Sequence, residues 1–381
     1  MSDSSTLRPT ESAPQEDGAP DAHVAPQQAS PALLEVRDLH THFKTPRGIL
    51  RAVDGVSFTL EQGATLGIAG ESGSGKSALV RSIMDLTAAN AIRPTGHVIF
   101  DGRDMTEMPR WEARHFWGPQ IAMVFQDPMT SLNPVKRVGA QLTESMRHHL
   151  GLSRRDARSR AIDLLHQVRI PEPKRRLDQY PHELSGGMRQ RVTIAIALAC
   201  EPRLLIADEP TTALDVTVQK QILELLASLQ EAHHMAMILI THDLGVIAGY
   251  TDRTAVMYAG QVVEEASTTT LFDEVRHPYT NALLASIPRV EEASHVRLEA
   301  ISGRPPDMTA PPAACRFAAR CRLAQDKCLT DAPTLVQDGS EGHRFRCFYP
   351  VGTGDGVNAL KKNLERGSSA AGLPLKSKVT S

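Results

Sequence analysis

The chain has 381 residues, which suggests two to three structural units, since domains average about 150 residues. Its 42 Lys and Arg residues nearly balance its 44 Asp and Glu residues, so it lacks the basic excess typical of nucleic-acid-binding proteins. No stretch approaches the ~18 consecutive apolar residues of a membrane span, and residues 1–31 lack the apolar core of a signal peptide. We therefore expect a cytosolic chain that does not bind nucleic acid.

The N-terminal third predicts a tail followed by strands. Residues 1–31 are rich in Ser, Pro, Gln and acidic residues, and we expect a disordered tail because few side chains there can be buried. From Leu33, short aliphatic runs broken by Gly, Pro and Asp predict strands at LLEVRDLHTHF, AVDGVSFTL and ATLGIAG. The segment ALVRSIMDL after Ser77 predicts a helix, and GHVIFDG predicts another strand.

The remainder predicts an α/β domain followed by an irregular extension. Amphipathic helices over about 130–183 precede an alternation of apolar helices and strands, which is typical of a mostly parallel sheet with a helical insertion. We expect the α/β domain to span residues 32–266. Residues 267–352 are irregular and Pro-rich and predict a small C-terminal extension, and residues 353–381 predict a second disordered tail.

Residues 70–77 read GESGSGKS and match the phosphate-loop pattern between a predicted strand and a predicted helix. In such a loop the backbone amides surround phosphates, Lys76 reaches the β and γ phosphates, and Ser77 ligates Mg²⁺. A glycine-rich turn that opens a helix is the alternative, but the flanking strand and helix favour a nucleotide site. The predicted nucleotide-binding residues of this segment are Gly70, Glu71, Ser72, Gly73, Ser74, Gly75, Lys76, Ser77 and Ala78.

Two carboxylates follow a second apolar run, LLIADE at residues 204–209. Such a run predicts a buried strand, and its C-terminal end is where α/β sheets bind ligands. Asp208 is suited to lie beside Mg²⁺, and Glu209 is suited to polarise the attacking water. Together with the phosphate loop, they predict a nucleotide hydrolase.

Further motifs carry a resemblance to a known family. They are LSGGM at 184–188, ALD at 213–215, THD at 241–243 and Gln126 within VFQDP. With GESGSGKS they make the chain similar to the ATP-binding subunits of ABC transporters, from about Leu33 to Val263. The resemblance implies a P-loop ATPase fold whose cofactors are ATP and Mg²⁺.

The resemblance also implies roles for residues outside the phosphate loop. Gln126 would ligate Mg²⁺ and contact the membrane subunits, His242 would hold the γ phosphate, and Asp215 would bridge two ATPase subunits. An aromatic residue would stack on adenine; Phe43 matches best, although His42 and Phe58 compete. The residues implied to contact ATP on the opposite subunit, at a second helix N-terminus, are Ser185, Gly186 and Gly187.

The C-terminal part resembles one branch of that family. QDPMTSLNP, THDLGVIA and RHPYTNALLASIP at 276–288 are similar to importers of oligopeptides, dipeptides and nickel. The branch implies a peripheral ATPase on the cytoplasmic face of the membrane that drives two permease subunits supplied by an extracytoplasmic binding protein. The solute, and the choice between a second copy and a related ATPase as dimer partner, stay open. A DNA-repair or translation ATPase is disfavoured by the single phosphate loop and the short insertion.

Four of the five cysteines cluster in the extension, at Cys315, Cys321, Cys328 and Cys347. The intervening five, six and eighteen residues fit zinc poorly, because zinc ligands usually pair at two to four residues. Longer loops are compatible with a [4Fe–4S] cluster, which this branch of the family also implies. Zinc and free thiols are the alternatives. Cys200 predicts a buried apolar side chain.

Overall fold

A computed structural model describes residues 32–113, 115–212, 214–286, 301–339 and 342–375. The tail predicted over residues 1–31 lies outside this part. Among the described residues, no helix is long and apolar enough to cross a membrane.

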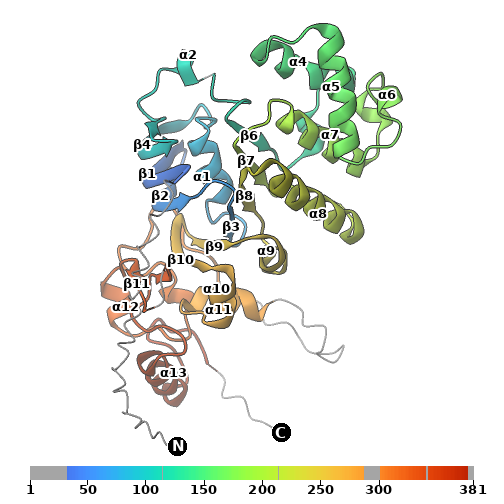
Figure 1. Cartoon of the computed structure of the whole chain (residues 1–381). Helices are drawn as coiled ribbons and strands as arrows, with labels where there is room; N and C mark the ends of the chain where they lie inside the picture. Colours follow the sequence, from blue (N-terminus) through green and yellow to red (C-terminus); the bar gives the residue numbers. More distant parts are fainter. Residues whose placement is uncertain (1–31, 114, 213, 287–300, 340–341, 376–381) are drawn as a thin grey trace, which may run out of the picture. The chain divides into compact units, whose positions relative to one another are not determined.

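The central sheet has eight strands, β3 (Thr65–Ala69), β6 (Ile121–Val124), β7 (Leu204–Asp208), β8 (Ala236–Ile240), β9 (Arg253–Tyr258), β10 (Gln261–Ser267), β11 (Val336–Gln337) and β12 (Arg344–Phe345). Their spatial order is β11-β12-β10-β9-β3-β8-β7-β6 (Figure 1). The strands from β9 to β6 run parallel, which confirms the mostly parallel sheet. All residues of β3, β7 and β8 are buried, as expected for parallel strands covered on both faces.

A second, antiparallel sheet consists of β1 (Leu34–Thr45), β2 (Gly48–Leu60), β4 (Ala91–Phe100) and β5 (Arg103–Asp104). The sequence predicts its longer strands but not their separation from the central sheet. One hydrophobic core joins the two sheets and helix α1 (Lys76–Ile83), with Leu34 and Phe100 on one side and Ile68 on the other. This core fixes the phosphate loop between β3 and α1.

The predicted helical insertion forms a group of helices (Figure 1), and its core is continuous with buried residues of β6, β7 and β8. Helix α4 (Val138–His149) packs against α5 (Arg154–Gln167) and α7 (Gly186–Leu198), burying Met146 and Leu165. Apolar residues at helical spacing on each helix explain this packing. Shorter helical segments in and near this region are α2 (Arg110–Ala113), α3 (Pro128–Ser131), α6 (Pro173–Arg176) and the 3₁₀ turn η1 (Pro181–Glu183).

The described residues of the C-terminal extension belong to the same compact unit as the α/β domain. Its strand β12 pairs with β10, so the extension continues the central sheet. A third core contains Tyr258 of β9 together with Phe317 and Cys321 of the extension. The remaining helices are α8 (Val216–His233), α9 (Leu244–Tyr250), α10 (Thr268–Asp273), α11 (Pro278–Ala285), η2 (Ala318–Arg320), α12 (Lys327–Thr330) and α13 (Gly354–Arg366).

The predicted disordered tail over residues 353–381 is wrong for its first part, because α13 occupies it. Thr353 caps this helix by accepting a hydrogen bond from the Gly356 amide. Asn363 is fully buried and donates to the carbonyl oxygens of Arg322 and Ala324. The segment is thus anchored by a polar side chain, which an argument from apolar content overlooks.

Candidate active site

The phosphate loop packs closely against two neighbouring strands, and this requires glycine at two positions. Gly70 has φ +148° and Gly75 has φ +106°, which L side chains rarely adopt. A Cβ at Gly70 would lie 2.3 Å from the Met257 carbonyl oxygen, and one at Gly75 would lie 2.2 Å from that of Ala52. The loop therefore lies close to the backbone of β2 and β9, and its amides lead into the N-terminus of α1.

Lys76 begins α1 and is buried. Its Nζ atom donates to the carbonyl oxygens of Gly70 at 2.7 Å and Glu71 at 3.1 Å. Burial lowers the pKa of Lys76, while the carboxylates of Glu209, Asp208 and Glu71 oppose that shift. The ammonium thus lies inside the loop, where a phosphate would supply the negative charge it lacks.

Ser77 and Asp208 meet at the end of β7, with the Ser77 hydroxyl donating to Asp208 Oδ1 at 2.9 Å. Burial raises the pKa of Asp208 even though the Ser77 hydrogen bond lowers it. The second oxygen, Oδ2, is buried and has no hydrogen-bond partner among the residues that the structure describes, and the same holds for the Ser74 hydroxyl. A buried carboxylate oxygen without a partner is suited to a cation or its bound water, so this pair fits Mg²⁺.

The Glu209 carboxylate lies beside Asp208 and is surrounded by predicted site residues. Its Oε2 atom lies 2.9 Å from Gln126 Nε2, 3.0 Å from Thr212 Oγ1 and 3.6 Å from His242 Nδ1. The backbone of Glu209 has φ 47°, an unusual value for a non-glycine residue. The side chain is 14 % exposed whereas His242 is 65 % exposed. The structure therefore brings Gln126, Glu209 and His242 together at an open edge of the sheet.

Ser185 of the LSGGM motif and Asp215 of the ALD motif are exposed residues at helix N-termini. Ser185 caps α7 by accepting a hydrogen bond from the Met188 amide, and Asp215 caps α8 through the Val218 amide. Within the described residues, no hydrogen bond or ion pair joins Ser185, Gly186 or Asp215 to the phosphate loop. Ala213 lies outside those residues.

Of the three candidates for stacking on adenine, Phe43 has a ring that is neither buried in the core nor paired with a carboxylate. Phe43 lies on β1 opposite Leu50 and is half-buried. Phe58 is buried in the core between the sheets, and His42 faces Asp54 at 3.5 Å. Phe43 is therefore the better match to the position that the family resemblance implies.

The four clustered cysteines line one cavity, although up to 32 residues separate them in sequence. Burial raises the pKa of Cys315 to about 11 and that of Cys347 to about 12, and it also raises the pKa values of Cys321 and Cys328. Backbone amides counter this by hydrogen bonding to the sulfurs. Of the described residues, the one group able to supply three donor atoms within 4.8 Å of one another is His40, His42 and Asp54, not the cysteines.

Three residues at the site escape the sequence analysis. Thr212 is the second residue after the DEP segment and lies three positions after Glu209, and this short separation in sequence could have suggested it. Arg320 and Tyr279 both contact Glu71, yet 249 and 208 residues separate them from it in sequence. No local pattern reveals such contacts.

Two family models match the chain. Residues 53–212 match the ABC transporter family, and residues 263–328 match the C-terminal region of oligopeptide/dipeptide transporters. The second match covers the segment in which the sequence suggested a particular branch.

Known relatives and solved structures agree with these models. The chain is 52 % identical over 306 residues to the oligopeptide transport ATP-binding protein OppD of Bacillus subtilis, covering 80 % of this chain and 86 % of that protein. It is 49 % identical over 297 residues to the dipeptide transport ATP-binding protein DppD of Lactococcus lactis, covering 78 % and 85 %. A dimeric post-hydrolysis structure of the ATP-binding cassette MJ0796 with ADP and Pi aligns with TM-score 0.56 and 28 % identity, covering 62 % of this chain and 98 % of that one.

Proposed function

The chain belongs to the ATP-binding proteins of oligopeptide and dipeptide ABC transporters, and from this we propose how its residues hydrolyse ATP. It is the energy-coupling ATPase subunit of a peptide importer. The observation that supports the assignment of individual residues is the cluster around Glu209, next to the phosphate loop. The relatives named above are peptide transport proteins, which favours peptides over nickel and over a soluble role in DNA repair or translation.

In the proposed reaction, Glu209 accepts the proton of the water that attacks the γ phosphate. Gln126 and Thr212 hold the carboxylate by hydrogen bonds to Oε2, and His242 contacts the γ phosphate from the exposed side. Lys76 neutralises charge on the β and γ phosphates. Ser77, Asp208 and the amide oxygen of Gln126 would hold Mg²⁺, which supplies charge neutralisation on the phosphates when bound.

We further propose that the exposed LSGGM motif binds the ATP of a second ATPase subunit. Ser185 and the amides of Gly186 and Gly187 form a helix N-terminus that, among the described residues, has no hydrogen bond or ion pair to its own phosphate loop, and such a terminus attracts anions. Asp215 would lie at the same dimer contact, and Phe43 would stack on adenine. The partner is a second copy or a related subunit, and MJ0796 is dimeric in a structure of similar fold.

Replacing Ser185 with Arg is expected to lower ATP turnover at least about tenfold while ATP affinity changes less than about threefold. The bulky cation would block the opposite nucleotide face but not the chain's own phosphate loop. Ser153→Arg is the matched control, because Ser153 is also an exposed serine that caps a helix, α5. Equal turnover by the two variants, measured as phosphate release, would rule out the trans contact.

The importer also requires partners in and outside the membrane. We propose two permease subunits that contact this chain near Gln126 and the helical insertion, and an extracytoplasmic binding protein that delivers the peptide. The ATPase would then be a peripheral protein on the cytoplasmic face. This proposal is supported by the names of the relatives, which are transport ATP-binding proteins.

We propose that the four extension cysteines hold a [4Fe–4S] cluster. The fit rests on four thiols around one cavity, with backbone amides directed at the sulfurs. A tetrahedral zinc site places sulfurs about 3.8 Å apart, given Zn–S bonds of about 2.3 Å. No three of these sulfurs lie within 4.8 Å of one another, so the wider cluster suits them better.

Anaerobically purified protein is expected to contain about four iron atoms and four sulfides per chain and to absorb visible light. Cys321→Ser should lose most of this iron, because it removes one ligand. Cys200→Ser is the control, since Cys200 is buried in another part of the fold. Protein with one zinc and no iron, or with no metal, would contradict the cluster.

A further inference from the structure

The C-terminal extension contacts the phosphate loop through a bidentate ion pair. Arg320 Nη1 donates to Glu71 Oε2 at 2.6 Å, and Nη2 donates to Oε1 at 2.9 Å. Glu71 is the second residue of GESGSGKS. The Arg320 side chain is only 3 % exposed and the Glu71 side chain 29 % exposed, and the pair is bidentate, so it is more strongly held than a fully exposed ion pair.

Other groups fix the guanidinium in place. Its Nε atom donates to the Ser302 carbonyl oxygen at 3.0 Å, and Nη2 also donates to that of Ile301 at 3.3 Å. The rings of Tyr258 and Phe317 lie 5.7 and 6.0 Å from its central carbon. Arg320 is therefore fixed by contacts other than its ion pair and can act as a support for Glu71.

Tyr279 holds the backbone of the same residue. Its buried hydroxyl accepts a hydrogen bond from the Glu71 amide at 2.8 Å. The Glu71 carbonyl oxygen in turn accepts from Lys76 Nζ at 3.1 Å and from the Ser74 amide at 3.1 Å. Glu71 thus links the extension to Lys76. Its side chain and amide contact Arg320 and Tyr279 of the extension, and its carbonyl oxygen contacts the lysine that would meet the phosphates.

We propose that Arg320 and Tyr279 are positioning residues that set the ATP affinity of the phosphate loop through Glu71. This rests on the ATPase function of the chain. A loop held in its phosphate-binding shape binds ATP without first being ordered, and loss of either support reduces affinity by that ordering cost. Neither residue reaches the reacting atoms, so binding should suffer more than the chemical step.

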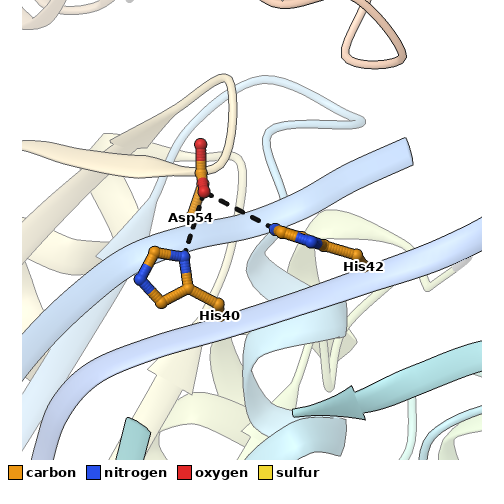
Figure 2. A group of neighbouring side chains, drawn as sticks. All are labelled: His40, His42 and Asp54. Carbon is orange, nitrogen blue, oxygen red and sulfur yellow. Dashed lines mark hydrogen bonds and ion pairs between the residues drawn. The ribbon is translucent and has the colours of Figure 1, made fainter. Parts of the chain in front are cut away.

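A second contact keeps the extension docked independently of Arg320. Arg316 bonds to Asp54 Oδ2 and donates to the Ala259 carbonyl oxygen at 2.6 Å. Figure 2 shows His40 and His42 on the other oxygen of Asp54, at 3.0 and 3.5 Å. We read this group as an ion-pair network and not as a metal site, because the Arg316 guanidinium already neutralises the carboxylate.

The test measures MgATP affinity of the full chain by titration, and KM and kcat of the assembled transporter. Arg320→Met is expected to raise Kd and KM about tenfold while kcat changes less than about threefold. Arg320→Lys should recover part of the lost ATP affinity, since lysine keeps the positive charge but cannot make the bidentate hydrogen bonds of the guanidinium. Arg304→Met, at an exposed arginine of the same segment, should behave as wild type.

A double-mutant cycle and a smaller variant complete the test. Arg320→Met combined with Glu71→Gln should raise KM no more than Arg320→Met alone, because the effect passes through Glu71. If Arg320→Met fails to fold, Tyr279→Phe removes one hydroxyl and should still raise KM about threefold. Wild-type KM in the folded variants, or additive effects in the double variant, would overturn the proposal. Absence of ATPase activity in the wild type would instead contradict the proposed function.

Discussion

Glu209→Gln is expected to lower the rate of ATP hydrolysis at least about 100-fold while leaving ATP affinity close to that of the wild type. The amide has nearly the same shape as the carboxylate and can keep the hydrogen bonds near Gln126 and Thr212. It cannot accept the proton of the attacking water. Phosphate release measures the turnover, and nucleotide titration measures the affinity. ATP-driven association with the second subunit should survive and outlast that of the wild type.

Glu201→Gln is the matched control for this variant. Glu201 is an exposed glutamate whose backbone, like that of Glu209, is left-handed, with φ 54° against 47°. The same chemical change is thus made in a similar local conformation away from the site. Turnover in Glu209→Gln comparable to that in Glu201→Gln would remove Glu209 as the base and leave water activation to another group.

Lys76→Met is expected to weaken MgATP binding at least about 100-fold. Lys76 is buried, and burial lowers its pKa against the opposing carboxylates. Its Nζ atom donates to two backbone carbonyl oxygens and, among the described residues, to no carboxylate. The γ phosphate therefore meets the Lys76 ammonium, which is already desolvated and positioned. Methionine has no positive charge to offer in its place.

The control for this experiment is Lys220→Met, at an exposed lysine of α8 whose nearest carboxylate lies 3.9 Å away. That variant should bind MgATP as the wild type does. Thermal unfolding of both variants checks that the fold survives. If folded Lys76→Met binds MgATP normally, the GESGSGKS segment is not the phosphate site.

Local motifs explain why so much of the site can be predicted from sequence. GESGSGKS contains its own strand, turn and helix start, and LLIADE contains a buried strand with both carboxylates at its end. Each motif specifies backbone and chemistry within a few residues. Parallel strands then bring Asp208 to Ser77 at one sheet edge, as the α/β pattern requires.

The parts that sequence reasoning misses depend on distant contacts. The antiparallel sheet and the central sheet pack on one shared core. The sequence of a single strand does not indicate to which of the two sheets it belongs. Helix α13 depends on the buried amide of Asn363 in a segment with few apolar residues. The pairing of Arg320 with Glu71 joins positions 249 residues apart, and no pattern within a few residues of either position indicates it.

The central claim is that this chain couples ATP hydrolysis to peptide import. The most direct measurement is uptake of a labelled peptide into vesicles that contain the chain, its two permeases and the binding protein, with ATP supplied on the side of the ATPase. Wild-type vesicles should accumulate peptide only with MgATP, and vesicles with Glu209→Gln should not. Equal uptake without ATP, or with Glu209→Gln, would contradict the account.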